Sequence, residues 1–346
     1  MSMSVIKAVP GMQCGTADTS AAAAVWAEKN CYVDLWTGLL QALGLEARAC
    51  MPVALAIDFL GDQWTFFKPS HHDLRELYGI DVQELTVWRP LLDHAEEHLS
   101  AGRLIATESD AFWLPDTAGT DYRTKHTKTT ILINEVDRQA KRLGYFHNAG
   151  YYWLNGEDFD RTFRLDETGD ACLPLFAELV MLDRQVRYPP TVLREMSLQL
   201  LERYMARTPL DNPVARFASR FRSDLPQMQA SGLDHYHAWA FAATRQLGSA
   251  CELVAQNLRW IGETDETRFH DPATQFEAVA ALSKSFILKG ARAVTSKRTF
   301  DDGGMLAAMA LAWERGTSSL GTALLARSLR GAVGSMPAQA EFEAAR

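Results

Sequence analysis

The chain has 346 residues and a formal net charge of −8, and it is 47% hydrophobic and 23% charged. These values are typical of a globular protein rather than a disordered one. The acidic balance argues against nucleic acid as the main partner, because phosphate binding needs a basic surface.

Cysteine usage and hydropathy indicate the cellular compartment of the protein. The five cysteines include no Cys-x-x-Cys pair, which argues against a disulfide scaffold or a cysteine-rich zinc site. The first residues lack the basic stretch and apolar core of a signal peptide, and no apolar run is long enough to cross a bilayer. We therefore expect a cytoplasmic protein without a membrane partner.

The first predicted element is a helix that begins at Cys31, with Asn30 before it as a good N-cap. One apolar face of helical period is formed by Tyr32, Leu35, Trp36, Leu39, Leu40 and Leu43. The sequence thus places a thiol in the first turn of a buried helix, where the positive end of the helix dipole favours the thiolate. Papain-like folds build their nucleophile on a cysteine placed in this way.

The rest of the first half mixes strand and helix patterns. Residues 103–107, 126–136, 143–146 and 151–154 read as strands, and 50–59 and 64–67 are further candidate strands. Short helical patterns lie at 73–78, 91–99 and 158–163. One helical part followed by clustered strands fits an α+β domain.

The second half changes character, because nearly every segment from about Pro190 onward has helical periodicity. Helices are expected at 192–205, 235–261, 272–294 and 305–329. We predict a papain-like α+β domain at residues 1–188, an all-α helical domain at 189–330 and a loosely ordered tail at 331–346.

A cysteine nucleophile needs a histidine base and a third group that orients the histidine. His126 stands after a polar loop and at the start of a β-rich run, and Asn148 ends the neighbouring predicted strand. Cys31, His126 and Asn148 are therefore the candidate catalytic residues. His147 adjoins Asn148, so an error of one residue in strand register would exchange the two.

Several stretches carry a resemblance to a bacterial family called domain of unknown function eighteen thirty-nine. The similar stretches are 30–36, 62–68, 74–79, 108–122, 126–131 and 144–153. The resemblance extends over most of the chain, including the helical half.

The order of helix-start cysteine, Phe-Trp-Leu-Pro loop, His126 strand and Asn148 strand is also similar to the N-terminal domain of the butirosin biosynthesis acyltransferases. Those papain-like proteins move an acyl group from a carrier-protein thioester onto an amine. The first family is associated with genes for amino acid:carrier protein ligases. The two resemblances imply a cysteine acyltransferase that takes an aminoacyl group from the phosphopantetheine arm of an acidic carrier protein and gives it to a small-molecule amine. No resident cofactor or metal is implied.

One departure concerns the oxyanion hole. Papain-like peptidases usually carry a glutamine several residues before the cysteine, whereas Val25 and Trp26 occupy that region here. Either the backbone N–H groups at Cys31 suffice, or another side chain such as Gln63 supplies the donor. The absence favours a thioester-handling enzyme over an ordinary peptidase.

An acidic carrier protein would meet positive charge on its partner. Basic residues flank His126, follow its strand and recur in the helical half, namely Arg123, Lys125, Lys128, Arg138, Lys141, Arg142, Lys284, Lys289, Arg292, Lys297 and Arg298. Asp110 and Asp116 are candidates for binding a cationic aminoacyl group.

Two other readings of the same site stay open. Water in place of the amine would make the protein a thioesterase or amidohydrolase, and a silent Cys31 would leave a module that binds a carrier protein. The spelling His94-Ala95-Glu96-Glu97-His98 matches a short metalloprotease motif, but a solvated helix face explains it better. No phosphate-binding glycine loop occurs, so nucleotide use has no support.

Overall fold

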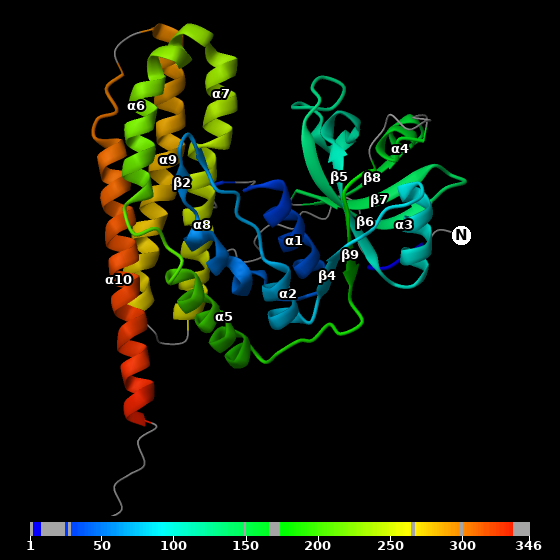
Figure 1. Cartoon of the computed structure of the whole chain (residues 1–346), viewed down its shortest axis with the longest axis horizontal. Helices are drawn as coiled ribbons and strands as arrows, with labels where there is room; N and C mark the ends of the chain where they lie inside the picture. The colour runs from blue at the N-terminus through cyan, green and yellow to red at the C-terminus, as the bar shows by residue number, and fades with distance from the viewer. Residues whose placement is uncertain are drawn as a thin grey trace, which may run out of the picture. The chain divides into compact units, whose positions relative to one another are not determined.

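The computed structural model describes residues 3–7, 25–26, 29–148, 150–165, 174–263, 267–297 and 300–334. The chain divides into two compact units, Met1–Ala54 with Phe66–Leu200, and Leu55–Thr65 with Leu201–Arg346. The fold is α+β, with a sheet-containing N-terminal region and a helical C-terminal region (Figure 1).

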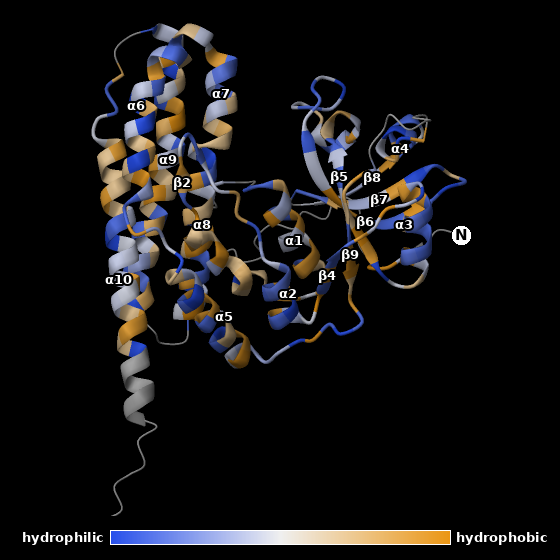
Figure 2. Ribbon diagram, viewed as in Figure 1, coloured by the Kyte–Doolittle hydropathy of each residue, from blue (hydrophilic) through white to orange (hydrophobic). Residues whose placement is uncertain are grey.

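An antiparallel sheet forms the centre of the first unit. Its strands follow the order β4-β9-β5-β6-β7-β8, and β1 pairs with β6. The strands are β1 (Met3–Ser4), β4 (Asp81–Glu84), β5 (Leu104–Asp110), β6 (Lys128–Asp137), β7 (Arg142–His147), β8 (Gly150–Asn155) and β9 (Ala177–Met181). Figure 2 shows hydrophobic residues along these strands, whereas the turn between β6 and β7 is hydrophilic.

Helices and short 3₁₀ turns surround the strands. They are α1 (Cys31–Ala42), η1 (Ala47–Ala56), α2 (His71–Tyr78), α3 (Leu91–Ser100), η2 (Ala111–Trp113), η3 (Pro115–Thr117), α4 (Glu157–Thr162) and α5 (Pro190–Met205). Helix α1 packs on β6, β7 and β8, and its apolar face is fully buried, including Leu35, Trp36 and Leu39. The amphipathic pattern of this helix therefore decides which surface of the sheet it covers.

The second unit consists of long helices and one short hairpin. Its elements are β2 (Phe59–Leu60), β3 (Gln63–Trp64), α6 (Pro213–Ser231), α7 (Leu233–Ala242), α8 (Thr244–Gly262), η4 (Thr267–Phe269), α9 (His270–Ser296) and α10 (Met305–Gly334). Helix α9 packs against α6, α7, α8 and α10 (Figure 1).

The hairpin β2–β3 belongs to the helical unit because its aromatic side chains enter the helical core. The Phe59 ring lies 5.6 Å from that of Phe217 and 5.3 Å from that of Trp64. Arg216 on α6 also binds the Asp58 carboxylate at 2.6 Å. A hairpin this short is stable only with such packing.

The structure corrects four details of the predicted elements. Residues 50–59 are mainly the 3₁₀ helix η1, because the alanine-rich stretch around Pro52 has few of the β-branched residues that strands favour. Of the expected strand at 64–67 only Trp64 pairs, in the hairpin β2–β3, and the expected helix at 235–261 is divided at Ala243. Helix α10 extends to Gly334, and residues 335–346 of the expected tail lie outside the described residues.

We expect Phe59→Ala to weaken the helical unit. The side chain is 2% exposed, and removing a buried aromatic costs about 3–5 kcal/mol. Hydrogen exchange should accelerate in α6 and stay unchanged in β6. The neighbouring Leu60, 54% exposed, is the matched control, and Leu60→Ala should change the free energy of unfolding by less than about 0.5 kcal/mol. Equal effects of both changes would contradict the assignment of the hairpin to the helical core.

Candidate active site

Cys31 occupies the first helical position of α1, as the sequence predicts. The Asn30 side-chain oxygen accepts hydrogen bonds from the backbone N–H groups of Tyr32 and Val33, at 3.1 and 2.9 Å. The Asn30 amide donates to the carbonyl of Phe67 at 3.1 Å and fastens the cap to the next segment. The cap fixes where α1 begins and therefore where the thiol stands.

The same cap limits the choice of oxyanion donors. Because Asn30 takes the N–H groups of Tyr32 and Val33, the N–H of Cys31 is the first-turn donor without an acceptor in the described part of the chain. A free N–H at the positive end of a helix is a suitable donor to an oxyanion. Gln63, the side chain suggested by the sequence, lies in β3 of the helical unit.

A buried carboxylate holds the first turn of α1 on the sheet. The hydroxyl of Tyr32 donates to Glu178 on β9, and His71 Nε2 lies 3.0 Å from the other oxygen of that carboxylate. Glu178 is 2% exposed. The Lys68 ammonium stands 4.2 Å from the centre of the Tyr32 ring and adds positive charge to the cluster.

These contacts set the ionisation of the cluster. Burial by itself raises the pKa of Glu178, but the close contact with His71, the hydrogen bond from Tyr32 and the charge of Lys68 outweigh it, so the pKa lies below the ordinary value of 4.5. Burial, followed by the neighbouring Glu178 carboxylate, raises the pKa of Tyr32 well above its usual range. The network therefore contains a carboxylate and a neutral phenol at neutral pH.

His126 is held by Asp110 at the ends of β5 and β6. Its Nδ1 donates to Asp110 Oδ2 at 2.6 Å, and its ring stacks on Phe112 with centroids 4.3 Å apart. The other Asp110 oxygen accepts the backbone N–H groups of Phe112 and Thr127. His126 Nε2 has no partner among the described residues, and the side chain is 70% exposed. The ring is thus oriented through one nitrogen and open at the other, as a general base requires.

Strand pairing shows which groups share a face of the sheet. Glu178 on β9 pairs with Ala106 on β5, and paired residues point to the same face of a sheet. Asp110 lies four residues after Ala106 on β5, so its side chain points to that face too. Tyr32 reaches Glu178 from α1, which places the start of α1 on that face as well. Cys31 and the His126–Asp110 pair therefore belong to one side of the sheet. No hydrogen bond joins Cys31 Sγ to a histidine in the part of the chain that is described.

His147 belongs to the opposite face. Its Nε2 accepts a hydrogen bond from the Thr129 hydroxyl at 2.7 Å, and Thr129 alternates with Thr130, which pairs with Glu108 on the α1 face. His147 Nδ1 donates to Asp116 at 2.5 Å, and the Tyr145 hydroxyl donates to the second Asp116 oxygen at 2.5 Å. Both nitrogens of this buried ring are occupied, so the network fastens the loop of η3 to the sheet.

Asn148 stands in the turn between β7 and β8 with φ of +46°. Asparagine tolerates this left-handed conformation better than most residues. The backbone conformation of the turn is therefore a sufficient reason for an asparagine at this position. The hydrogen-bond partner of His126 Nδ1 is Asp110. Asn148 as the third catalytic residue stays a prediction.

The basic residues around His126 are largely compensated by carboxylates. Arg123 binds Asp158 at 2.6 Å, Lys128 binds Glu108 at 2.8 Å, and similar pairs neutralise Arg138, Lys141 and Arg142. The Asp116 carboxylate is likewise committed to His147 and Tyr145. The basic residues around His126 therefore present less net positive charge to an acidic partner than the sequence alone indicates.

The remaining sequence motifs show ordinary structural roles. His94 and His98 stack on α3 with centroids 6.3 Å apart, and burial lowers the pKa of both. Among the described residues, no cluster of three or more His, Cys, Asp or Glu side chains is arranged to hold a metal ion. Within that same part of the chain, no helix combines the length and apolar character that crossing a membrane requires.

Sequence reasoning missed the roles of Asp110, Glu178 and His71. Asp110 has a signal in the sequence, because it lies in the segment between the strand predicted at 103–107 and His126. Glu178 has none, since β9 was not predicted and a glutamate gives no sign of burial.

Thiol reactivity separates Cys31 from the buried cysteines. Burial raises the pKa of Cys50 to about 12 and raises that of Cys251 further, so about one Cys50 thiol in 10⁴ is ionised at pH 8. In the native protein, iodoacetamide should label Cys31 at least about 100-fold faster than Cys50 or Cys251 by peptide mapping. Equal labelling rates in the native protein would contradict the conclusion that Cys31 is the reactive thiol. In the denatured protein, which is the control, the three cysteines should react at similar rates. Cys14 and Cys172 lie outside the described residues.

Glu178→Gln should destabilise the first unit by about 1.5–3 kcal/mol at pH 7, because a charged hydrogen-bond acceptor is lost. The folded pKa of Glu178 lies below the unfolded value, so its contribution is present above the ordinary glutamate range and is lost as the pH falls through the folded pKa. Urea unfolding of both proteins at pH 7 and in the acidic range tests this, and a constant difference would contradict it. Tyr32→Phe removes one neutral donor and should cost about 1 kcal/mol.

Family models match both parts of the chain. The model of the DUF1839 N-terminal domain matches residues 16–182, and that of the DUF1839 C-terminal domain matches residues 190–322. No curated protein matches the sequence.

Proposed function

We propose that this chain, which belongs to the DUF1839 family, is a papain-like cysteine acyltransferase that moves an aminoacyl group from a carrier-protein thioester to an amine. The observation that carries the proposal is the placement of a helix-start cysteine and a carboxylate-oriented histidine on one side of an antiparallel sheet. That arrangement is the one a cysteine–histidine pair needs.

In the first step the Cys31 thiolate attacks the carbonyl carbon of the donor thioester. A C–S bond to Cys31 forms and the C–S bond to the phosphopantetheine arm breaks, with the proton taken from the Cys31 thiol returned by His126 to the leaving thiol. The Cys31 N–H would donate to the oxyanion of the tetrahedral intermediate.

In the second step the acceptor amine attacks the acyl group on Cys31. His126 removes a proton from the amine, an amide bond forms, and Cys31 leaves as thiolate. Asp110 holds the imidazole by Nδ1 throughout and stabilises it when it is protonated. The chemistry uses no resident cofactor or metal.

The partners are therefore an acidic aminoacyl carrier protein and a small amine. A thioester is a more reactive acyl donor than a peptide bond. Attack on it therefore needs less oxyanion stabilisation than a peptidase provides. A free thiol nucleophile suits a reducing compartment such as the cytoplasm.

One experiment tests the proposal directly. The protein is mixed with a carrier protein loaded with an isotope-labelled amino acid, and intact mass is followed with and without added amines. We expect an aminoacyl adduct on Cys31 that decays when an amine is supplied. Decay in water alone would make the protein a thioesterase or amidohydrolase. Absence of any adduct would contradict both enzyme functions and leave a module that binds a carrier protein.

Variants separate the catalytic roles. His126→Ala and Asp110→Asn should each lower the rate of adduct formation by about 10²–10⁴-fold, because each removes or misorients the base. His71→Ala is the control, since His71 contacts Glu178 rather than Asp110, and its rate should stay within about tenfold of wild type. A larger loss of rate with His71→Ala than with His126→Ala would show that His126 is not the catalytic base.

Asn148→Gly tests the third predicted residue. Glycine keeps the positive φ of the turn while removing the side-chain amide, so the backbone of the turn should be retained. With Asp110 as the orienting group, the rate should stay within about threefold of wild type. A loss as large as that of Asp110→Asn would assign the orienting role to Asn148.

A further inference from the structure

Helices α7 and α9 of the helical unit present large apolar side chains to solvent. Leu233 and Phe241 on α7 are 37% and 61% exposed, and Leu288 on α9 is 60% exposed. These three residues, with Arg292 and Thr295, define what we call the α7–α9 surface. Leu233 lines a common hollow with Ala291 and Thr295 of α9, and apolar side chains that cluster in this way mark interaction sites.

Close packing holds the two helices in a fixed register. The Tyr236 hydroxyl donates to the carbonyl of Ile287 at 2.9 Å, and a Cβ on Gly290 would lie 2.0 Å from that hydroxyl. Gly290 is therefore required for the close approach. The α7–α9 surface is built on rigid elements, so its exposed side chains keep their spacing in the absence of a partner.

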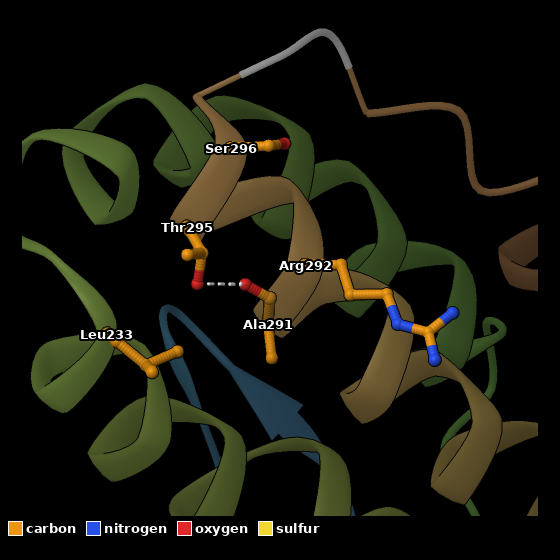
Figure 3. A pocket seen from close by; sticks show the side chains of 5 residues that line it. All are labelled: Leu233, Ala291, Arg292, Thr295 and Ser296. Carbon is orange, nitrogen blue, oxygen red and sulfur yellow. Dashed lines mark hydrogen bonds between the residues drawn. The ribbon is translucent and has the colours of Figure 1, made fainter.

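A hollow of about 410 Å³ lies at one end of this surface. Figure 3 shows Leu233 on one side and Ala291 and Thr295 on the other, with the Arg292 guanidinium extending away. The Thr295 hydroxyl donates back to the carbonyl of Ala291 at 2.9 Å, so its hydrogen-bonding capacity is directed into its own helix. The hollow thus suits an apolar side chain, with a cation at its edge.

Two arginines place positive charge on this surface, Arg292 on α9 and Arg245 in the first turn of α8. Arg292 has no ion pair among the described residues, in contrast to the compensated arginines around His126. Asp234 is the single acidic residue of α7, and the Arg245 guanidinium lies 4.4 Å from the centre of the Phe241 ring.

We infer that the α7–α9 surface binds an acidic amphipathic helix of a partner protein. An apolar residue of that helix would fill the hollow beside Leu233, and apolar residues one and two turns away would meet Leu288 and Phe241. Carboxylates beside the apolar stripe would face Arg292. The inference is independent of the chemistry proposed for Cys31.

The size of the surface favours a transient partner over a second copy of the chain. Three partly exposed large side chains offer on the order of 300 Å² of apolar area. Stable complexes bury about 800 Å² on each partner. A second copy would also bring its own positive charge to Arg292, which opposes self-association.

Fluorescence anisotropy with a designed peptide tests the inference on the full chain. The probe is a labelled helical peptide with leucines along one stripe and glutamates elsewhere, and the control peptide has lysines in place of the glutamates. We expect the acidic peptide to bind more tightly than the basic one by at least about tenfold, with affinity that falls as salt rises. Equal affinity of the two peptides, or no binding of the acidic one, would overturn the inference.

Matched variants assign the binding to this surface. Leu288→Glu and Arg292→Glu should each weaken binding at least about tenfold. Leu325→Glu and Arg315→Glu place the same changes on exposed positions of α10, with Leu325 at 63% exposure, and should leave binding unchanged. Equal losses in both pairs would overturn the inference. So would a wild-type dimer, measured by light scattering, that Leu288→Glu dissociates, because a second copy would then occupy the surface.

Discussion

The buried contact between Tyr32 and Glu178 determines how the first unit is arranged. It joins the first turn of α1 to the strand β9, where His71 lies 3.0 Å from the same carboxylate and the Lys68 ammonium stands over the Tyr32 ring. Because Cys31 is the residue before Tyr32, this contact also fixes the side of the sheet on which the thiol stands. The low pKa of Glu178 reflects how strongly these groups favour the ionised form.

Two histidine–carboxylate pairs illustrate how environment separates structure from chemistry. The side chains of His147 and Asp116 are each 2% exposed, and both ring nitrogens of the imidazole are hydrogen-bonded. His126 and Asp110 are 70% and 36% exposed, and Nε2 of the imidazole remains available. The first pair holds the loop of η3 in place, whereas the second leaves one imidazole nitrogen free for the proton transfer that we propose. Alternation along β6 and β7 sorts the pairs to opposite faces of one sheet.

The sequence predicts the periodic parts of the fold and fails where tertiary contacts decide. The helix at Cys31, the strand after His126 and the helical second half follow from apolar periodicity, and the structure confirms them. The short strand β9 has too few residues to show a period, and the hairpin at Phe59 joins the helical core through contacts with residues more than 150 positions away.

The same limit applies to the candidate site. Cys31 and His126 could be proposed from local pattern, but Asp110 as the partner of His126 depends on the pairing of β5 with β6.

The proposed chemistry requires Cys31 and His126 to act as a pair. The most direct measurement is cross-linking with 1,3-dibromoacetone, which joins a thiol to an imidazole only when the two groups are adjacent, followed by mass spectrometry of the linked peptides. We expect a bridge between Cys31 and His126, and less of it in Asp110→Asn. A bridge from Cys31 to His71, or modification of Cys31 without any bridge, would contradict it.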